Sequence, residues 1–164
     1  MNFAVLVSGH GTNLAAIINA VKRKAIRANL RLVVSDNPQA FALKRAKKAK
    51  IKAVVIKRED FSDREGFEGE LLKHLKGEKI DFIVLAGFMR ILSPFLIGQY
   101  PRRILNIHPA LLPAFKGTHA IKDAFEFGAK VTGVTVHLVD EKVDHGPIVL
   151  QESLKINPQD TVLP

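Results

Sequence analysis

The fold class follows from residues 3–21, F-A-V-L-V-S-G-H-G-T-N-L-A-A-I-I-N-A-V. The stretch begins with a continuous apolar run, Phe3–Val7, which is typical of a strand buried on both faces of a parallel sheet. A glycine-rich turn and a segment of helical composition follow. Such a unit presents backbone N–H groups at the start of a helix, where the helix dipole favours an anion. The stretch therefore predicts an α/β fold, with either an anion site or a plain tight turn at residues 8–14.

The glycine-rich turn differs from the dinucleotide-binding fingerprint G-x-G-x-x-G. Gly9 and Gly11 match its first two glycines, but Leu14 stands at the third position. This pattern favours a single phosphate over a pyrophosphate. Thr12 and Asn13 are residue types that often cap the start of a helix.

The remaining chain alternates strand patterns with helix patterns. Ser62 and Glu65 form a predicted capping box, and the last strand is expected to be the hairpin partner of the strand before it. Alternation of this kind predicts one α/β domain over residues 1–164, with a mainly parallel central sheet flanked by helices and ligands at the carboxyl ends of the strands. Further strands are expected at 30–35, 53–56, 81–86, 103–107, 131–139 and 148–156, and helices at 39–49, 62–75, from Ser93 onward and at 118–128.

Composition excludes several classes of protein. The chain has no cysteine, so disulfide and thiolate chemistry are absent. Its first residues lack the pattern of a signal peptide, and no apolar run reaches the roughly 20 residues that a membrane span needs. We therefore expect a cytoplasmic protein.

Positive charge is concentrated in one segment. The net charge is +9, yet residues 22–58 contain 13 Lys and Arg and a single acid, Asp36. This basic segment fits either a solvated helix surface or a polyanion-binding patch. Phe41 is its only aromatic residue, so it lacks the interleaved aromatic side chains that stack on bases.

The segment I-L-N-I-H at 104–108 carries the candidate chemistry. Residues i and i+2 of a strand face the same way, so Asn106 and His108 share a face next to the proline-containing loop that follows. His108 can act as a general acid or base, Asn106 can donate to a developing oxyanion, and Asp144 is the candidate carboxylate that orients the imidazole. No serine or cysteine lies beside His108, and no H-x-x-x-H spacing suggests a metal. These residues favour direct transfer between two bound substrates. His137, alone within a strand, is interpreted as a hydrogen-bonded structural residue.

Residues 87–92, G-F-M-R-I-L, follow a predicted strand. Their apolar side chains either pack the next helix or line a slot for a flat ligand, with Arg90 available for a carboxylate. Arg64 lies in the first turn of a predicted helix, where a cation opposes the dipole, and an anionic partner would explain that position.

Four motifs in order make the chain resemble the phosphoribosylglycinamide formyltransferases: S-G-H-G-T-N-L at 8–14, G-F-M-R-I-L at 87–92, N-I-H-P-A-L-L-P-A-F-K-G at 106–117 and V-D-H-G-P-I at 143–148. The resemblance implies a Rossmann-like formyltransferase fold with an antiparallel C-terminal portion. It also implies transfer of a formyl group from 10-formyltetrahydrofolate, as co-substrate and without a metal, to the amine of glycinamide ribonucleotide in de novo purine biosynthesis.

The resemblance also assigns roles to residues. Asn106, His108 and Asp144 would be the catalytic trio, with His108 as general acid. The ribonucleotide phosphate would be held by Gly11, Thr12, Asn13 and Leu14. Folate would be contacted by Arg64, Met89, Arg90, Ile91, Leu92, Asn106 and the loop residues Val139, Asp140, Glu141 and Val143.

Other interpretations remain open at this stage. The methionyl-tRNA formyltransferases and formyltetrahydrofolate hydrolases share the Asn-x-His motif but carry additional domains, and a noncatalytic nucleotide- or RNA-binding module would use the basic segment. The family continues into a further helix and strand, which the resemblance implies are absent here. We expect small-molecule partners only, with no membrane and no nucleic acid, in a monomer or homodimer.

Overall fold

Strand β1 is the centre of the first of two compact units, Met1–Ile104, in a computed structural model that describes residues 1–162. All five residues of the apolar run Phe3–Val7 are buried, as a central strand requires. The strand pairs in parallel with β2 on one side and β4 on the other, and β3 pairs in parallel with β2. The four strands are β1 (Asn2–Val7), β2 (Asn29–Ser35), β3 (Lys52–Val55) and β4 (Phe82–Leu85).

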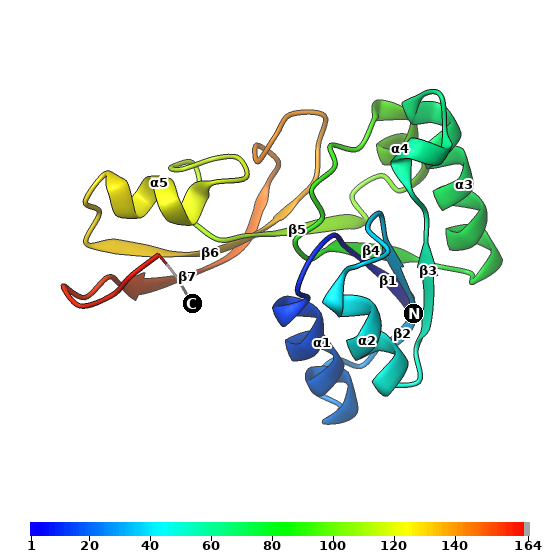
Figure 1. The fold of residues 1–164 in the computed structure, drawn as a ribbon, viewed down its shortest axis with the longest axis horizontal. Coiled ribbons are helices and arrows are strands. Elements are labelled where there is room, and N and C mark those ends of the chain that lie inside the picture. The colour runs from blue at the N-terminus through cyan, green and yellow to red at the C-terminus, as the bar shows by residue number, and fades with distance from the viewer. Residues whose placement is uncertain (163–164) are drawn as a thin grey trace. The chain divides into compact units, whose positions relative to one another are not determined.

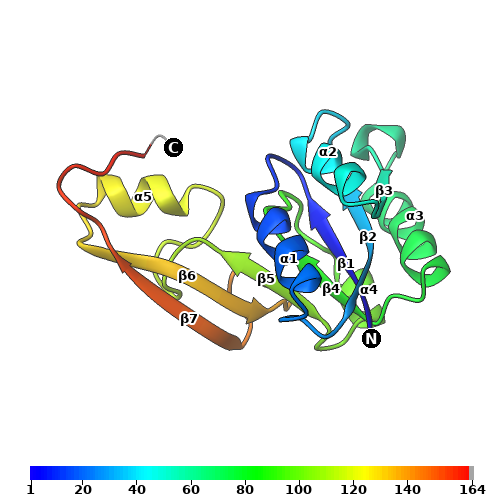
Figure 2. The same cartoon turned by 90° about the horizontal axis from the view of Figure 1, so that it is seen from below.

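Helices cover both faces of this parallel sheet (Figure 1), with α1 beside α2 on one face and α3 beside α4 on the other. Helix α3 buries Phe67, Leu71 and Leu75, which are spaced four residues apart and therefore share one face. Figure 2 shows the same layers from below. The helices of this unit are α1 (Thr12–Lys22), α2 (Phe41–Lys48), the short 3₁₀ helix η1 (Arg58–Asp60), α3 (Arg64–Gly77) and α4 (Pro94–Gln99).

Two predicted helix caps are wrong by one or two residues. The side chain of Asp63, not of Ser62, caps α3 by accepting a hydrogen bond from the Gly66 N–H at 2.7 Å. Both residue types can cap, and the extended backbone of Asp63 decides between them. The cap of α1 is Gly11 in a left-handed conformation, so Thr12 and Asn13 occupy the first two helical positions. Within residues 1–162, no side chain accepts a capping hydrogen bond from the first N–H groups of α1.

The second unit, from Leu105 onward, is built around the antiparallel strand β6. Buried residues alternate along β6 with half-buried ones, and Gly133, Thr135 and His137 form the buried face. Strand β7 pairs with β6 as the predicted hairpin. Helix α5 follows His119, its cap residue, and lies within the segment 118–128 where a helix is expected. The elements are β5 (Ile104–His108), whose first residue closes the first unit, α5 (Ala120–Glu126), β6 (Val131–Leu138) and β7 (Ile148–Lys155).

The predicted fold class is therefore confirmed. Parallel strands flanked by helices make up the N-terminal part, and antiparallel strands make up the C-terminal part. Among the described residues, no helix is long and apolar enough to span a lipid bilayer.

Candidate functional site

Asp144 is the central residue of a partly buried polar cluster in the second unit. Its Oδ1 atom accepts a hydrogen bond from the Asn106 amide at 3.2 Å, and its Oδ2 atom accepts one from the Gly117 N–H at 2.8 Å. The Oδ2 atom also lies 3.4 Å from Nδ1 of His108. The structure therefore brings together the three residues predicted to be catalytic.

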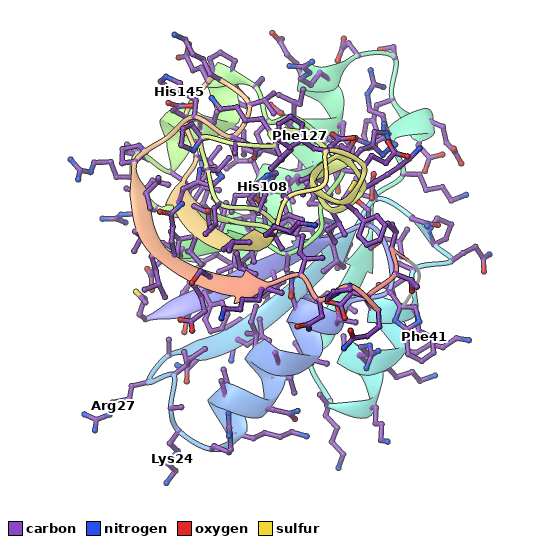
Figure 3. The ribbon with its side chains drawn as sticks, turned by 90° about the vertical axis from the view of Figure 1, so that its left-hand side faces the viewer. Lys24, Arg27, Phe41, His108, Phe127 and His145 are labelled. Carbon is purple, nitrogen blue, oxygen red and sulfur yellow. The ribbon has the colours of Figure 1, made fainter. Side chains whose placement is uncertain are left out.

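His108 faces an oxygen at each ring nitrogen. Nδ1 faces the Asp144 carboxylate, and Nε2 lies 2.8 Å from the carbonyl oxygen of Phe115. Both oxygens can only accept, so an imidazole that carries a proton on each nitrogen can donate to both. Only 3% of His108 is exposed, and in Figure 3 it lies inside the unit while His145 points outward at the edge. A buried imidazole beside a carboxylate is a suitable general acid.

His137 supports Asn106 from the neighbouring strand. The two residues are opposite each other in the pairing of β5 with β6, and Nε2 of His137 lies 3.1 Å from the Asn106 amide nitrogen. An amide nitrogen only donates, so Nε2 accepts and the proton of His137 is on Nδ1, which donates to the Leu138 carbonyl at 2.9 Å. His137 is hydrogen-bonded, as its strand position suggested, and its Nε2 atom also lies 3.5 Å from Oδ1 of Asp144. Its contact with Asn106 was not predicted, because it depends on the strand register.

A pocket of about 260 Å³ lies at the carboxyl end of β1 in the first unit. Ligands of parallel α/β sheets bind at the carboxyl ends of the strands, and the pocket lies at such an end. The first three N–H groups of α1, from Thr12, Asn13 and Leu14, have no acceptor within the helix. The Leu14 side chain is fully buried, so only its backbone can meet a ligand. The pocket is lined by Ser8, Gly9, His10, Gly11, Thr12, Asn13, Ala86, Gly87 and Met89.

The loop after β4 is tied to this pocket. The Ser8 N–H donates to the Gly87 carbonyl at 2.9 Å, and the Ser8 hydroxyl accepts from the Met89 N–H at 2.9 Å. Both glycine-containing loops are therefore held at the same end of the sheet.

The proposed apolar slot at residues 87–92 is only partly available to a ligand. Met89 and Ile91 are more than half exposed, whereas Leu92 is buried in the core. Nε of Arg90 pairs with Oδ2 of Asp36 at 2.7 Å, and Oδ1 of Asp36 is buried without a hydrogen-bond partner among the described residues. Arg64 is exposed at the first position of α3.

Loop 139–144 is held by Asp140. One oxygen of its carboxylate accepts from the Lys142 N–H at 3.0 Å, and the other lies 2.8 Å from Nδ1 of His145. Partial burial raises the pKa of Asp140, but the His145 and Lys142 hydrogen bonds outweigh it, so the net pKa is below 3.8. Val139 is half-buried, and Glu141 and Val143 are exposed.

Several cations of the basic segment have structural partners. Arg31 and Lys52 both pair with Glu78, and Arg45 bonds to His10. Lys24 and Arg27 project away from the end of α1 (Figure 3). Within residues 1–162, no group of three or more ligating side chains could hold a metal ion.

Comparison with known proteins gives a consistent result. The formyl transferase family matches residues 1–163. The trifunctional purine biosynthetic protein adenosine-3 of Drosophila melanogaster is 46% identical over 159 residues, which are 96% of this chain but 12% of that protein. The phosphoribosylglycinamide formyltransferase of Bacillus subtilis (strain 168) is 39% identical over 160 residues, which are 98% of this chain and 82% of that protein.

Solved structures similar to this chain include phosphoribosylglycinamide formyltransferases. The crystal structure of phosphoribosylglycinamide formyltransferase from Bacillus halodurans has a TM-score of 0.95 and 43% identity, and the match covers 99% of this chain and 84% of that one. The match to the family spans both compact units and includes the Asn-x-His motif and the glycine-rich turn. This chain belongs to the formyl transferase family.

Proposed function

We propose that this chain transfers a formyl group from 10-formyltetrahydrofolate to the amine of glycinamide ribonucleotide. The observation that carries the proposal is the Asp144 carboxylate, which holds Asn106 through one oxygen and faces His108 with the other. The names of the B. subtilis and B. halodurans relatives support this choice of reaction. The reaction belongs to purine biosynthesis, and we place it in the cytoplasm.

The first unit supplies the groups for the ribonucleotide phosphate. Gly11, Thr12 and Asn13 line the pocket, and the N–H groups at the start of α1, which have no acceptor within the helix, can donate to an anion. Leu14 contributes through its backbone alone, because its side chain is buried.

Folate recognition uses the residues that the resemblance assigns to it. Met89 and Ile91 offer exposed apolar surface, and Arg64 offers charge to a carboxylate. Nε of Arg90 is paired with Asp36, so Arg90 would meet a carboxylate through the other N–H groups of its guanidinium. Leu92 stabilises the loop from inside the core. The backbone of loop 139–144 is held in shape by the contacts of Asp140.

Transfer requires the movement of one proton and one formyl group. The glycinamide amine attacks the formyl carbon, and the oxygen of the tetrahedral intermediate accepts a hydrogen bond from Asn106. Asn106 has two amide N–H groups, so it must release either Asp144 or His137 to make this bond. The bond from that carbon to N10 of the folate then breaks. The proton that the amine loses reaches N10 through His108, and Asp144 stabilises the protonated imidazole. The His108 N–H that bonds to Phe115 must be released to the substrate for this step.

The test is formyl transfer measured with glycinamide ribonucleotide, wild type against His108→Ala. We expect the variant to lose about 100-fold to 10,000-fold in kcat, as is typical for removal of a general acid–base group. His119→Ala is the matched control, because His119 is exposed and its side chain caps no N–H group. Undiminished activity in His108→Ala, with an unchanged circular dichroism spectrum, would refute the mechanism. Equal release of tetrahydrofolate without the ribonucleotide would identify a hydrolase instead.

A further inference from the structure

His10, in the glycine-rich turn, is attached to helix α2 by three kinds of contact. Its ring stacks on that of Phe41, with centroids 4.9 Å apart and an interplanar angle of 20°. Nε of Arg45 donates to the His10 carbonyl at 3.0 Å, and Nη2 of Arg45 lies 3.3 Å from Nδ1 of the ring. The Arg45 guanidinium also lies 4.9 Å from the centre of the Phe41 ring. His10 is exposed to solvent, yet Phe41 stacks on its ring and Arg45 contacts its Nδ1 atom.

The backbone around His10 is fixed as well. The Ala42 N–H donates to the Gly9 carbonyl at 3.2 Å, so the first turn of α2 binds the loop on the residue before His10. Gly11, the residue after it, lies so close to Ala42 that a Cβ atom there would be 2.6 Å from the Cβ of Ala42. The start of α2, which Figure 3 marks with Phe41, therefore sets the position of the pocket's glycine loop.

Arg45 also determines where the proton of His10 lies. A guanidinium has donors only, so Nδ1 of His10 must be the acceptor and its proton is on Nε2. Nε2 has no hydrogen-bond partner among the described residues, although His10 lines the pocket. The positive groups near the ring are Arg45, which contacts it, and Lys44, which lies over Phe41 at 5.6 Å.

We propose that His10 is an additional ligand of the substrate phosphate, donating through Nε2–H, and that Arg45 and Phe41 are positioning residues that hold it in this tautomer. The proposal rests on the function proposed above and extends its phosphate site. The pocket would then bind phosphate through backbone N–H groups and one imidazole N–H, with Nη2 of Arg45 at 3.3 Å from the other ring nitrogen, Nδ1.

Steady-state kinetics test this role. Because a hydrogen bond to a charged group is lost, His10→Ala should raise KM for glycinamide ribonucleotide about tenfold or more, with kcat and KM for the folate nearly unchanged. His10→Gln should restore part of the loss, since its amide can donate from a similar place. Arg45→Gln and Phe41→Leu should raise the same KM. Lys44→Gln is the matched control on the same helix and should leave it unchanged.

Nitrogen-15 NMR provides a readout that a purely structural role would not change. At a pH where histidine is neutral, wild-type His10 should show the Nε2–H tautomer, and Arg45→Gln should show a mixture of both tautomers. An unchanged KM in His10→Ala, or an Nδ1–H tautomer in the wild type, would overturn the proposal.

A separate measurement distinguishes failure of this proposal from failure of the proposed reaction. Inorganic phosphate is titrated into the wild type and His10→Ala, with the amide signals of Thr12 and Asn13 as the probe. If the wild type transfers no formyl group, the proposed reaction fails, but weaker phosphate binding by His10→Ala would still support the role of His10. Equal binding by the two proteins, or no binding by either, would contradict it.

Discussion

Replacement of Gly11 by alanine tests how the pocket proposed to bind phosphate is built. Gly11 has a φ of +72°, in the left-handed region, and an added Cβ would lie 2.6 Å from the Cβ and 2.9 Å from the Cα of Ala42. Both neighbours are atoms of Ala42 in α2, and neither its Cα nor its Cβ atom can rotate away from the contact. Either the glycine loop or the helix must therefore move.

The expected cost has two parts. Left-handed backbone costs a residue with a Cβ about 1–2 kcal/mol, and forcing a methyl group into a packed contact costs about 1–3 kcal/mol. Gly11→Ala should therefore lower the free energy of unfolding by about 2–5 kcal/mol. It should also raise KM for glycinamide ribonucleotide, because Thr12 and Asn13 follow directly in the loop.

Two other glycines separate these contributions. Gly87 has a similar φ of +73° but nothing within 4 Å of an added Cβ, so Gly87→Ala should show only the backbone cost of about 1–2 kcal/mol. Gly9 has neither a left-handed φ nor a close neighbour, so Gly9→Ala should be nearly neutral in stability.

Urea denaturation followed by circular dichroism measures all three variants. If Gly11→Ala is no more destabilised than Gly87→Ala, the contact with Ala42 contributes nothing and the reasoning is refuted. Adding Ala42→Gly to Gly11→Ala should recover part of the loss, since it removes the atom at 2.6 Å and leaves the Cα at 2.9 Å.

Three further predictions concern side chains outside the pocket. Glu68 is buried and accepts hydrogen bonds from the Ser93 hydroxyl and, at 2.7 Å, the Ser93 N–H. Glu68→Ala should lower the free energy of unfolding by about 1–3 kcal/mol in urea, and a smaller loss than in Glu65→Ala, an exposed control in the same helix, would contradict this. Burial, and then the nearby Asp81, raise the pKa of Tyr100 above 10.0, so the unfolded chain loses this proton first and stability should fall as pH rises above 10.0. Tyr100 is the only tyrosine and there is no tryptophan, so its ultraviolet titration is direct, and a midpoint at 10.0 in the folded protein would refute the prediction. Asp140 has a lowered pKa, so its contribution to stability is present above 3.8 and is lost as pH falls through the folded value; His145→Ala should move the carboxyl titration upward in carbon-13 NMR, and no movement would rule out the His145 contact as a cause.

The sequence predicted the parts of the fold that depend on side-chain pattern. The run Phe3–Val7 is buried throughout because a central parallel strand has no exposed face. Helix starts were less accurate: Ser62 and Asp63 are both good caps, and only the backbone conformation selects Asp63.

The candidate site could be predicted to a similar extent. A spacing of two residues in a strand correctly put Asn106 and His108 on one face, where both meet Asp144. The contact of His137 with Asn106 depends on strand register, and the contact of His108 with the Phe115 carbonyl depends on the path of a loop. Neither the strand register nor the path of the loop can be predicted from the pattern of residue types.

The division of the chain at Ile104 has a consequence for its synthesis. The ribosome completes the whole first unit, including the glycine-rich pocket, before it adds Asn106. Asn106 and Asp144 are 38 residues apart, so the polar cluster of Asn106, His108 and Asp144 forms only after the strand and loop that carry Asp144 have emerged. Because domains generally fold as units, N-terminal first, a nascent chain should form its glycine-rich pocket before it forms this cluster.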